Sequence, residues 1–453
     1  MKFPGDSMES LTRRRFLFLA GGASSSPVFG FAQDPASPGQ SPADITLRIG
    51  ELSLELAPRR TVKTIGYNGQ VPGPLLRVPE GKPINVDVYN ETGDAEIVHW
   101  HGLHIPSDVD GSHEEGTPYV LARGQRRYVF TPTPAGTRWY HTHVGSGHNL
   151  NKATYTGQFG MLIVEPRSDP GRYDLEIPLL LHEWEPYWDD NGPRTVGYRL
   201  YSINGKMLGA GEPVRVRPGQ RVLFRIVNAS ATLAHRLALP GHTFRVMALD
   251  GNPVPAPRSI PILELAPAER IDAIVEMSHP GCWILGSTDD QRRSAGMGIV
   301  IEYAGVAGPP LWAAASKTVW DYTIFGGEHP PMPPDDLVRL VFKEVSGHRW
   351  TINGKSFPKA DPIMVYANRR YRWVLDNQSA DPHPVHLHRH AFELVRVAGN
   401  PASGLMKDVV MVPAWKEVEF DVTTDHPGPT LFHCHQQFHM DFGFMAMMFY
   451  ENG

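Results

Sequence analysis

Hydrophobic and polar residues alternate along many short stretches of this chain, and prolines and glycines separate these stretches. The segments "INVDVYN" (84–90), "VLFRIVN" (222–228) and "YRWVLDN" (371–377) show period-two or nearly continuous apolar character. Such segments are typical of strands in a β-sandwich, where one face is buried. The 42 prolines and 44 glycines recur at short intervals, which favours many short strands joined by turns over long helices.

The same unit occurs three times along the chain. Each copy begins with an Asn-Gly turn, continues into an alternating strand that ends in an asparagine, and then enters a second strand. The copies occupy residues 67–105, 203–246 and 352–395, and their strand-ending asparagines are Asn90, Asn228 and Asn377. This repeat predicts an all-β protein of three consecutive sandwich domains.

Segments rich in glycine and proline separate the three predicted domains. From them we expect domains at 43–168, 172–304 and 318–453, after a targeting segment at 1–32. A length of 453 residues is consistent with several domains.

The N-terminal stretch "LTRRRFLFLAGGASSSPVFGFAQ" has an arginine cluster, a moderately apolar run and small residues before Gln33. Its Thr12–Leu17 segment resembles the twin-arginine export motif of bacteria, so we expect a periplasmic or otherwise extracytoplasmic protein. An ordinary secretory signal or a basic tail is the alternative. No other apolar run is long enough to span a bilayer, and a net charge of −5 without a basic block gives no indication of nucleic-acid binding.

The three copies differ at two positions that carry chemistry. Nine and eleven residues after the strand-ending asparagine, they hold His99 and His101, Leu237 and Leu239, and His386 and His388. The middle domain thus has apolar residues where its neighbours have imidazoles. We predict that it is a spacer without a metal site and that a metal site lies between the first and third domains.

Four His-x-His pairs occur in the chain, at 99–101, 141–143, 386–388 and 433–435. In a strand, residues i and i+2 point to the same face, so each pair offers two imidazoles on one side. Two pairs come from the first domain and two from the third. Eight imidazoles at a domain interface favour a cluster of late first-row metals, with copper the strongest binder.

Cys434 lies between His433 and His435, so in a strand its thiolate points to the face opposite their rings. It must then bind a different metal. His383 and His439 are the spare imidazoles, and two histidines with a thiolate make the trigonal set of a blue-copper site. Cys434 would thus connect two metal centres through covalent bonds.

With the motifs "HWHG", "WYHTH", "HPVHLH" and "HCHQQFH", the chain resembles the multicopper oxidases, specifically their three-domain laccase-like branch. The resemblance implies cupredoxin-like Greek-key domains and four copper ions. It implies a type 1 copper at His383, Cys434 and His439, and a type 2 copper at His99 and His386. The implied type 3 pair would be held by His101, His141, His143, His388, His433 and His435. Members of this family take single electrons from a reductant at type 1 copper. They reduce O₂ to water at the trinuclear cluster, which the type 2 ion and the type 3 pair form together.

Two features depart from the family pattern. Phe444 stands where a weak axial methionine is common, and Met445 is one position off, so we expect Phe444 to be an axial non-ligand that raises the type 1 potential. The second departure concerns the supply of protons. Asp110 matches the family's proton-relay aspartate, with a turn carboxylate as the structural alternative. A second relay acid is missing after His439, because Met440 stands there and Asp441 points away if the strand alternates.

The electron donor is less clearly indicated by the sequence. No methionine-rich insertion is visible, so we expect phenols and similar aromatic donors, with Asp381 as a candidate acceptor of a phenol proton. A metal-ion oxidase for Cu(I), Fe(II) or Mn(II) is the main alternative. A non-enzymatic envelope scaffold would have lost ligands that are present here, and four His-x-His pairs argue against a copper nitrite reductase.

Overall fold

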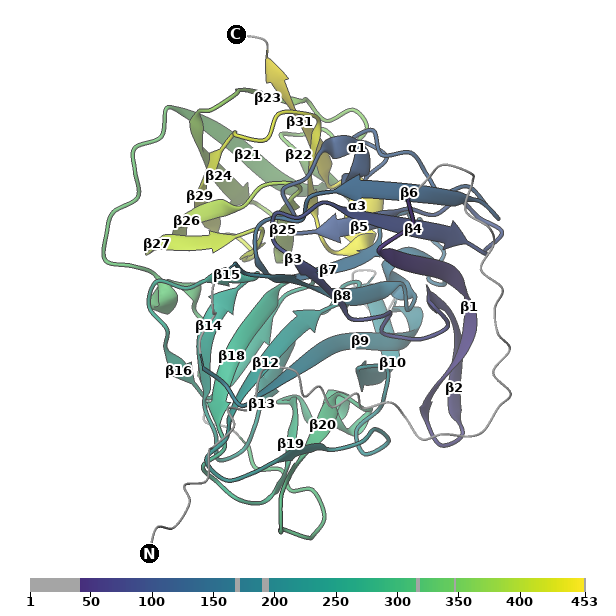
Figure 1. Cartoon of the computed structure of the whole chain (residues 1–453). Coiled ribbons are helices and arrows are strands. Elements are labelled where there is room, and N and C mark those ends of the chain that lie inside the picture. The colour runs from purple at the N-terminus through teal and green to yellow at the C-terminus, as the bar shows by residue number, and fades with distance from the viewer. Residues whose placement is uncertain (1–40, 168–171, 190–194, 315–317, 346–347, 452–453) are drawn as a thin grey trace, which may run out of the picture. The chain divides into compact units, whose positions relative to one another are not determined.

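The computed structural model describes residues 41–167, 172–189, 195–314, 318–345 and 348–451, which form six β-sheets in three pairs. Figure 1 shows the first pair in purple to blue, the second in teal to green, and the third in green to yellow. The predicted all-β architecture is confirmed. The export signal predicted at 1–32 lies outside the described residues.

The first pair contains eight strands. One sheet has the order β2-β1-β4-β6 and the other β3-β8-β7-β5. Their bounds are β1 Ile45–Ala57, β2 Arg60–Tyr67, β3 Leu76–Pro79, β4 Ile84–Asn90, β5 Val98–His101, β6 Gln125–Phe130, β7 Gly136–Thr142 and β8 Phe159–Glu165. In β4 every second residue is buried, as its alternating sequence predicts.

The middle pair has sheets of order β10-β9-β12-β18-β14-β15, with β16 beside β14, and β11-β20-β19-β13-β17. Their bounds are β9 Leu175–Asp189, β10 Thr195–Ile203, β11 Val214–Val216, β12 Arg221–Asn228, β13 His235–Ala238, β14 Phe244–Leu249, β15 Asn252–Pro253, β16 Ser259–Ile260, β17 Ile262–Leu265, β18 Arg270–Glu276, β19 Cys282–Ser287 and β20 Gly298–Tyr303. Leu237 and Leu239 are buried in its apolar core. Apolar packing therefore takes the place of the imidazoles of the other two copies.

The last pair has sheets of order β22-β21-β24-β29-β26-β27 and β23-β31-β30-β25-β28. Their bounds are β21 Asp336–Val345, β22 Arg349–Ile352, β23 Ile363–Tyr366, β24 Arg370–Asn377, β25 His383–Leu387, β26 Phe392–Val397, β27 Asn400–Lys407, β28 Val409–Val412, β29 Glu417–Thr423, β30 Thr430–Cys434 and β31 Met445–Glu451. The described helices are short: α1 Ser107–Asp110, η1 Ala153–Tyr155, α2 Asp290–Ser294, η2 Tyr322–Phe325 and α3 Gln437–Asp441. Within the described ranges, none of them has the length and apolar character that a bilayer crossing requires.

The Asn-Gly turns of the repeat have the expected left-handed backbone. Asn68, Asn204 and Asn353 have φ of 53°, 52° and 50°, and each following glycine is also positive. The strand-ending asparagines have one structural role in all three copies. Their side-chain amides donate to main-chain oxygens of adjoining loops, for example Asn90 Nδ2 to Asp94 O at 2.7 Å and Asn377 Nδ2 to Asp381 O at 2.8 Å. Each asparagine thus fixes the loop that leads into the next strand.

Strand register places the histidine pairs side by side. In the first pair of sheets His99 lies opposite His141, and in the last His386 lies opposite His433. Val385 lies opposite Cys434 on the same two strands. Hence β5 with β7, and β25 with β30, each present a small platform of imidazoles.

Candidate metal centre

His383, Cys434 and His439 form one compact set, which we call the outer group. The Cys434 Sγ atom lies 3.7 Å from His383 Nδ1 and 3.5 Å from His439 Nδ1, and these two nitrogens are 3.0 Å apart. The three side chains come from β25, β30 and α3 and are buried. A thiolate with two imidazole nitrogens is the donor set of a blue-copper site.

Mostly apolar rings surround the outer group. Trp350 stacks on the His439 ring at 4.0 Å, and the Phe444 ring lies 4.6 Å from the His383 ring. Ser379 Oγ is 2.8 Å from His383 Nε2, which leaves Nδ1 of His383 facing the sulfur. Burial raises the pKa of the Cys434 thiol and lowers the pKa of His383 to about 3. A soft cation would displace the thiol proton and use the neutral imidazoles as ligands.

Asp381 lies beside the outer group near the surface. Its Oδ2 atom is 3.8 Å from His439 Nε2, and 43% of its side chain is exposed. It is therefore placed to meet a molecule that approaches the outer group from solvent.

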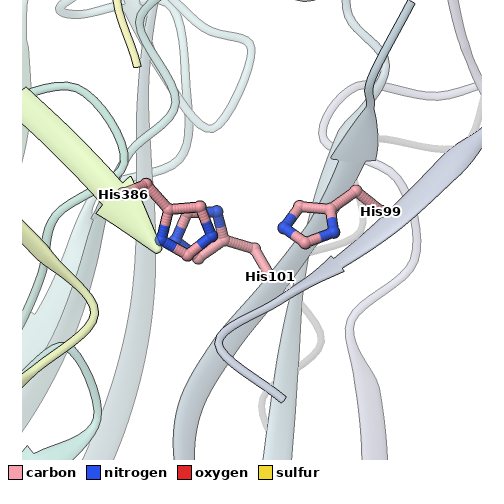
Figure 2. Close-up of side chains that lie close together, drawn as sticks. All are labelled: His99, His101 and His386. Atoms are coloured by element: carbon pink, nitrogen blue, oxygen red, sulfur yellow. The ribbon is translucent and has the colours of Figure 1, made fainter. Parts of the chain in front are cut away.

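The eight histidines of the four His-x-His pairs form a second assembly, which we call the inner cluster: His99, His101, His141, His143, His386, His388, His433 and His435. They fall into three sets, two of which share His101, and within each set the ligand atoms lie within 4.8 Å of one another. The sets are His99 with His101 and His386, His101 with His141 and His435, and His143 with His388 and His433. Figure 2 shows the first set, with His386 approaching from one strand and His99 and His101 from the facing side. The rings of His101 and His386 stack at 3.8 Å.

The ring nitrogens of the inner cluster are arranged to bind metal ions and not to form hydrogen bonds with one another. Among the described residues, the buried Nε2 atoms of His99, His386 and His435 have no hydrogen-bond partner. A buried polar atom without a partner is costly, and a bound cation would satisfy it. His388 Nε2 and His143 Nε2 lie 3.1 and 3.4 Å from His433 Nε2, the spacing of nitrogens that share one ion at about 2 Å.

Burial disfavours the charged form of several histidines of the inner cluster. Burial, followed by the neighbouring imidazoles, lowers the pKa of most of them well below the usual value: His101, His141, His143, His386 and His433. Neutral imidazole carries the lone pair that a metal needs. The lowered pKa of these five rings therefore favours cation binding.

The chain around Cys434 joins the two assemblies. The Cys434 sulfur belongs to the outer group, whereas His433 and His435 belong to two different sets of the inner cluster. Alternation within β30 turns the His433 ring away from the Cys434 sulfur, and His435 follows directly after the end of this strand. One covalent path of a few bonds thus leads from the outer group to the inner cluster.

Two carboxyl groups flank His388. Asp110 Oδ2 lies 2.9 Å from His388 Nδ1 and 3.1 Å from His99 Nδ1. Glu115 Oε2 lies 3.3 Å from the same His388 atom, and Glu115 Oε1 accepts a hydrogen bond from Leu431 N at 2.7 Å. Burial and the adjacent Asp110 raise the pKa of the Glu115 carboxyl. Sequence reasoning missed Glu115; its position five residues after Asp110, in the segment that follows helix α1, was the available signal.

The prediction that Asp441 points away assumed that a strand continues through this residue, and that assumption was wrong. Residues 437–441 form helix α3 and do not continue a strand, so alternation does not set the direction of Asp441. Its Oδ2 accepts hydrogen bonds from Ser146 Oγ at 2.7 Å and from the main-chain nitrogens of Ser146 and Gly147. Burial raises its pKa to about 6. Asp441 therefore connects the helix that carries His439 to the loop that follows His143.

Three models of the multicopper oxidase family match this chain, at residues 50–169, 189–299 and 329–453. The chain belongs to the multicopper oxidase family. This confirms the resemblance and the main functional prediction: the protein is a laccase-like, copper-dependent oxidoreductase that uses O₂ as acceptor.

Relatives of this multicopper oxidase include several named proteins. The multicopper oxidase MmcO of Mycobacterium tuberculosis is 28% identical over 434 residues, covering 86% of this chain and 83% of that protein. A copper resistance protein A homolog of Pseudomonas syringae pv. tomato is 23% identical and covers 96% of this chain and 98% of its own length. Laccase-2 of Podospora anserina is 27% identical and covers 88% and 77%.

Solved structures confirm the cupredoxin-like fold of this multicopper oxidase. A multi-copper oxidase from Pseudomonas thermotolerans is similar with a TM-score of 0.72 at 25% identity, covering 90% of this chain and all of that one. The iron-import multicopper oxidase Fet3p reaches a TM-score of 0.76 at 19% identity and shows the same fold.

Proposed function

We propose that this multicopper oxidase holds four copper ions and oxidises phenols and related aromatic donors. In the proposed assignment, the outer group His383, Cys434 and His439 takes the type 1 ion, and His99 and His386 take the type 2 ion. The type 3 pair is assigned to His101, His141, His143, His388, His433 and His435. The observation that carries this proposal is the division at Cys434, with its sulfur in the outer group and its neighbouring rings in the inner cluster.

When bound, copper supplies one-electron oxidation of the donor at the outer group and four-electron reduction of O₂ at the inner cluster. The chain contributes the path and the protons. The backbone from Cys434 to His433 and His435 provides the connection between the two sites. We assign Asp110 as the proton relay, because its carboxylate contacts two inner histidines and reduction of O₂ consumes protons.

Aromatic donors are supported by two features near the outer group. Asp381 is half exposed and lies 3.8 Å from His439 Nε2, so it can accept the proton that a phenol loses with its electron. The sequence also lacks a methionine-rich insertion; the presence of such an insertion would favour soft metal ions as donors.

The test is copper analysis with a visible spectrum, followed by oxygen uptake with a panel of donors. We expect about four coppers per chain, an intense blue band, and faster oxygen uptake with phenols than with Cu(I). A folded chain that takes up no copper would refute the proposal, and faster oxidation of Cu(I) would refute its donor class.

A metal-ion oxidase is the second candidate function. It is favoured by the copper resistance protein A homolog, which covers nearly the whole chain. The same comparison of phenol with Cu(I) as donor separates the two candidates.

We further propose that the protein works outside the cytoplasm after twin-arginine export, from the arginine motif near its N-terminus. The domain limits 43–168, 172–304 and 318–453 remain predictions. A fusion of residues 1–40 to a reporter that is exported only in the folded state tests the export route.

A further inference from the structure

Asp408 lies next to the inner cluster and contacts histidines from both of its halves. This residue is almost fully buried and precedes β28. Its Oδ1 atom is 3.1 Å from His101 Nε2, and its main-chain oxygen is 2.7 Å from His386 Nδ1. A single residue therefore contacts a histidine of the first pair of sheets and a histidine of the last pair, which we call the first and the last lobe of the protein.

The carboxylate of Asp408 is held by Arg270, which is the first residue of β18 in the middle pair of sheets. Arg270 Nη1 donates to Asp408 Oδ1 at 2.5 Å, and Arg270 Nη2 donates to Asp408 Oδ2 at 2.6 Å. Two parallel bonds of this kind fix a carboxylate in position and orientation.

The remaining donors of Arg270 are also used. Its Nε donates to Thr137 O, its second Nη1 proton to Ala268 O and its second Nη2 proton to Asp250 O, at 3.0 to 3.3 Å. All five N–H groups thus have acceptors, which come from all three pairs of sheets. The guanidinium is fully buried and has one geometry in which every donor is satisfied.

The backbone beside His101 leaves room for this pair. Gly102 has φ of +84°, and a Cβ atom there would lie 2.6 Å from Arg270 Nη2 and 2.8 Å from Asp408 Oδ2. Any side chain at this position would push the pair away from the histidines. The close approach of Arg270 and Asp408 to the inner cluster is therefore a built feature of the site.

These contacts determine which nitrogen of each ring faces a metal ion. Asp408 Oδ1 accepts the proton of His101 Nε2, so the lone pair of His101 is on Nδ1. The main-chain oxygen of Asp408 accepts the proton of His386 Nδ1, so the lone pair of His386 is on Nε2. The second contact of a ligating histidine sets its tautomer and ring direction, and loss of that contact weakens metal binding.

We propose that Arg270 is a positioning residue of the inner cluster: by holding the Asp408 carboxylate it fixes the tautomer of His101, and it keeps Asp408, whose main-chain oxygen contacts His386, in place. The middle region, which the sequence predicts to be a spacer, therefore controls how firmly the inner cluster retains copper. The inference rests on the proposed assignment of copper to the inner histidines.

The experiment replaces Arg270 in the full, copper-loaded chain with methionine and, separately, with lysine. Arg225 provides the matched control, because it is also a buried arginine of the middle region. It pairs with Asp272 at 2.6 Å and also contacts Thr137 Oγ1 of the first lobe. Copper per chain, blue absorption, melting temperature of the copper-free form, and copper release to a competing chelator are measured for each variant.

We expect Arg270→Met to keep the blue band and to bind inner-cluster copper about 10- to 100-fold more weakly. Arg270→Lys should recover part of this loss, because lysine restores the charge but not the paired bonds. Arg225→Met should lower the melting temperature to a similar degree while retaining copper. Equal copper retention in Arg270→Met and Arg225→Met would overturn the proposal.

If Arg270→Met does not fold, Asp408→Asn in the otherwise unchanged chain decides the question. It should show the same selective loss of inner-cluster copper, and wild-type retention in this variant would overturn the proposal. An unmodified chain that holds only the blue copper would instead refute the assignment of copper to the inner cluster.

Discussion

The outer group and the inner cluster differ in origin and in surroundings. The outer group comes entirely from the last lobe and is surrounded mainly by rings such as Trp350 and Phe444. The inner cluster is assembled from two lobes, and the carboxyl groups of Asp110, Glu115 and Asp408 contact its rings. An apolar pocket suits electron transfer without proton transfer, whereas a site that reduces O₂ needs acids within reach.

This difference implies that each site can be disabled separately. The largest effect is expected from Cys434→Ser, which removes the soft ligand of the outer group. Blue absorption should disappear and donor-driven oxygen uptake should fall to background, while inner copper remains bound. Visible spectra, copper analysis and oxygen uptake measure these effects.

Cys282→Ser is the control for this change, because Cys282 is the other buried free cysteine and lies on β19 of the middle region. It should leave the blue band intact. Retention of the band in Cys434→Ser would show that the outer group is not the blue site.

The next effect should arise at the inner cluster. Asp110→Asn keeps the size of the side chain but removes an ionised proton carrier, so reoxidation by O₂ should slow by about 100-fold. Stopped-flow reoxidation of the reduced protein measures the rate. The blue absorption should be unchanged, because Asp110 contacts only inner histidines among the ligands proposed here.

Asp108→Asn serves as the matched variant, since Asp108 is exposed on the same short helix α1. It should reoxidise at the wild-type rate. Unchanged reoxidation in Asp110→Asn would remove Asp110 from the proton path.

A smaller effect is expected at Phe444, which we predict to be an axial non-ligand of the outer group. Phe444→Met places a thioether next to the His383 ring, and a thioether stabilises Cu(II) relative to Cu(I). The type 1 potential should fall, and redox titration of the blue band measures this change.

Phe449→Met, on the partly exposed part of β31, should leave the potential unchanged. A potential that does not fall in Phe444→Met would contradict the role of Phe444 as axial non-ligand.

The smallest effect should come from the rim of the outer group. Asp381→Asn removes one proton acceptor for a phenol. The kcat/KM for phenols should decrease about fivefold, the factor that corresponds to the free energy of one hydrogen bond. Oxidation of ferrocyanide, which loses no proton, should not change. Equal losses with both donors would indicate that Asp381 supports the structure of the site and not proton transfer.

Sequence reasoning predicted the sites through local spacing. The i, i+2 spacing of the histidines around Cys434 predicted that the sulfur and the rings diverge. The structure places the sulfur in the outer group and both rings in the inner cluster, although β30 ends at Cys434 and His435 follows it. The Asn-Gly turns were predictable for the same reason, because their left-handed backbone depends on adjacent residues. Residues 437–441 were assumed to continue a strand, and this failed because the segment after Cys434 turns into α3 to bring His439 to the sulfur.

The repeat, the strand faces and the candidate ligands could be predicted from local sequence, since each depends on residues that are close neighbours in the chain. The acids and cations that contact these candidate ligands follow from the three-dimensional fold. Arg270 and Asp408 are 138 residues apart, and Asp408 is 307 residues from His101. Their contacts depend on the docking of three lobes, which no local pattern of hydrophobic and polar residues encodes.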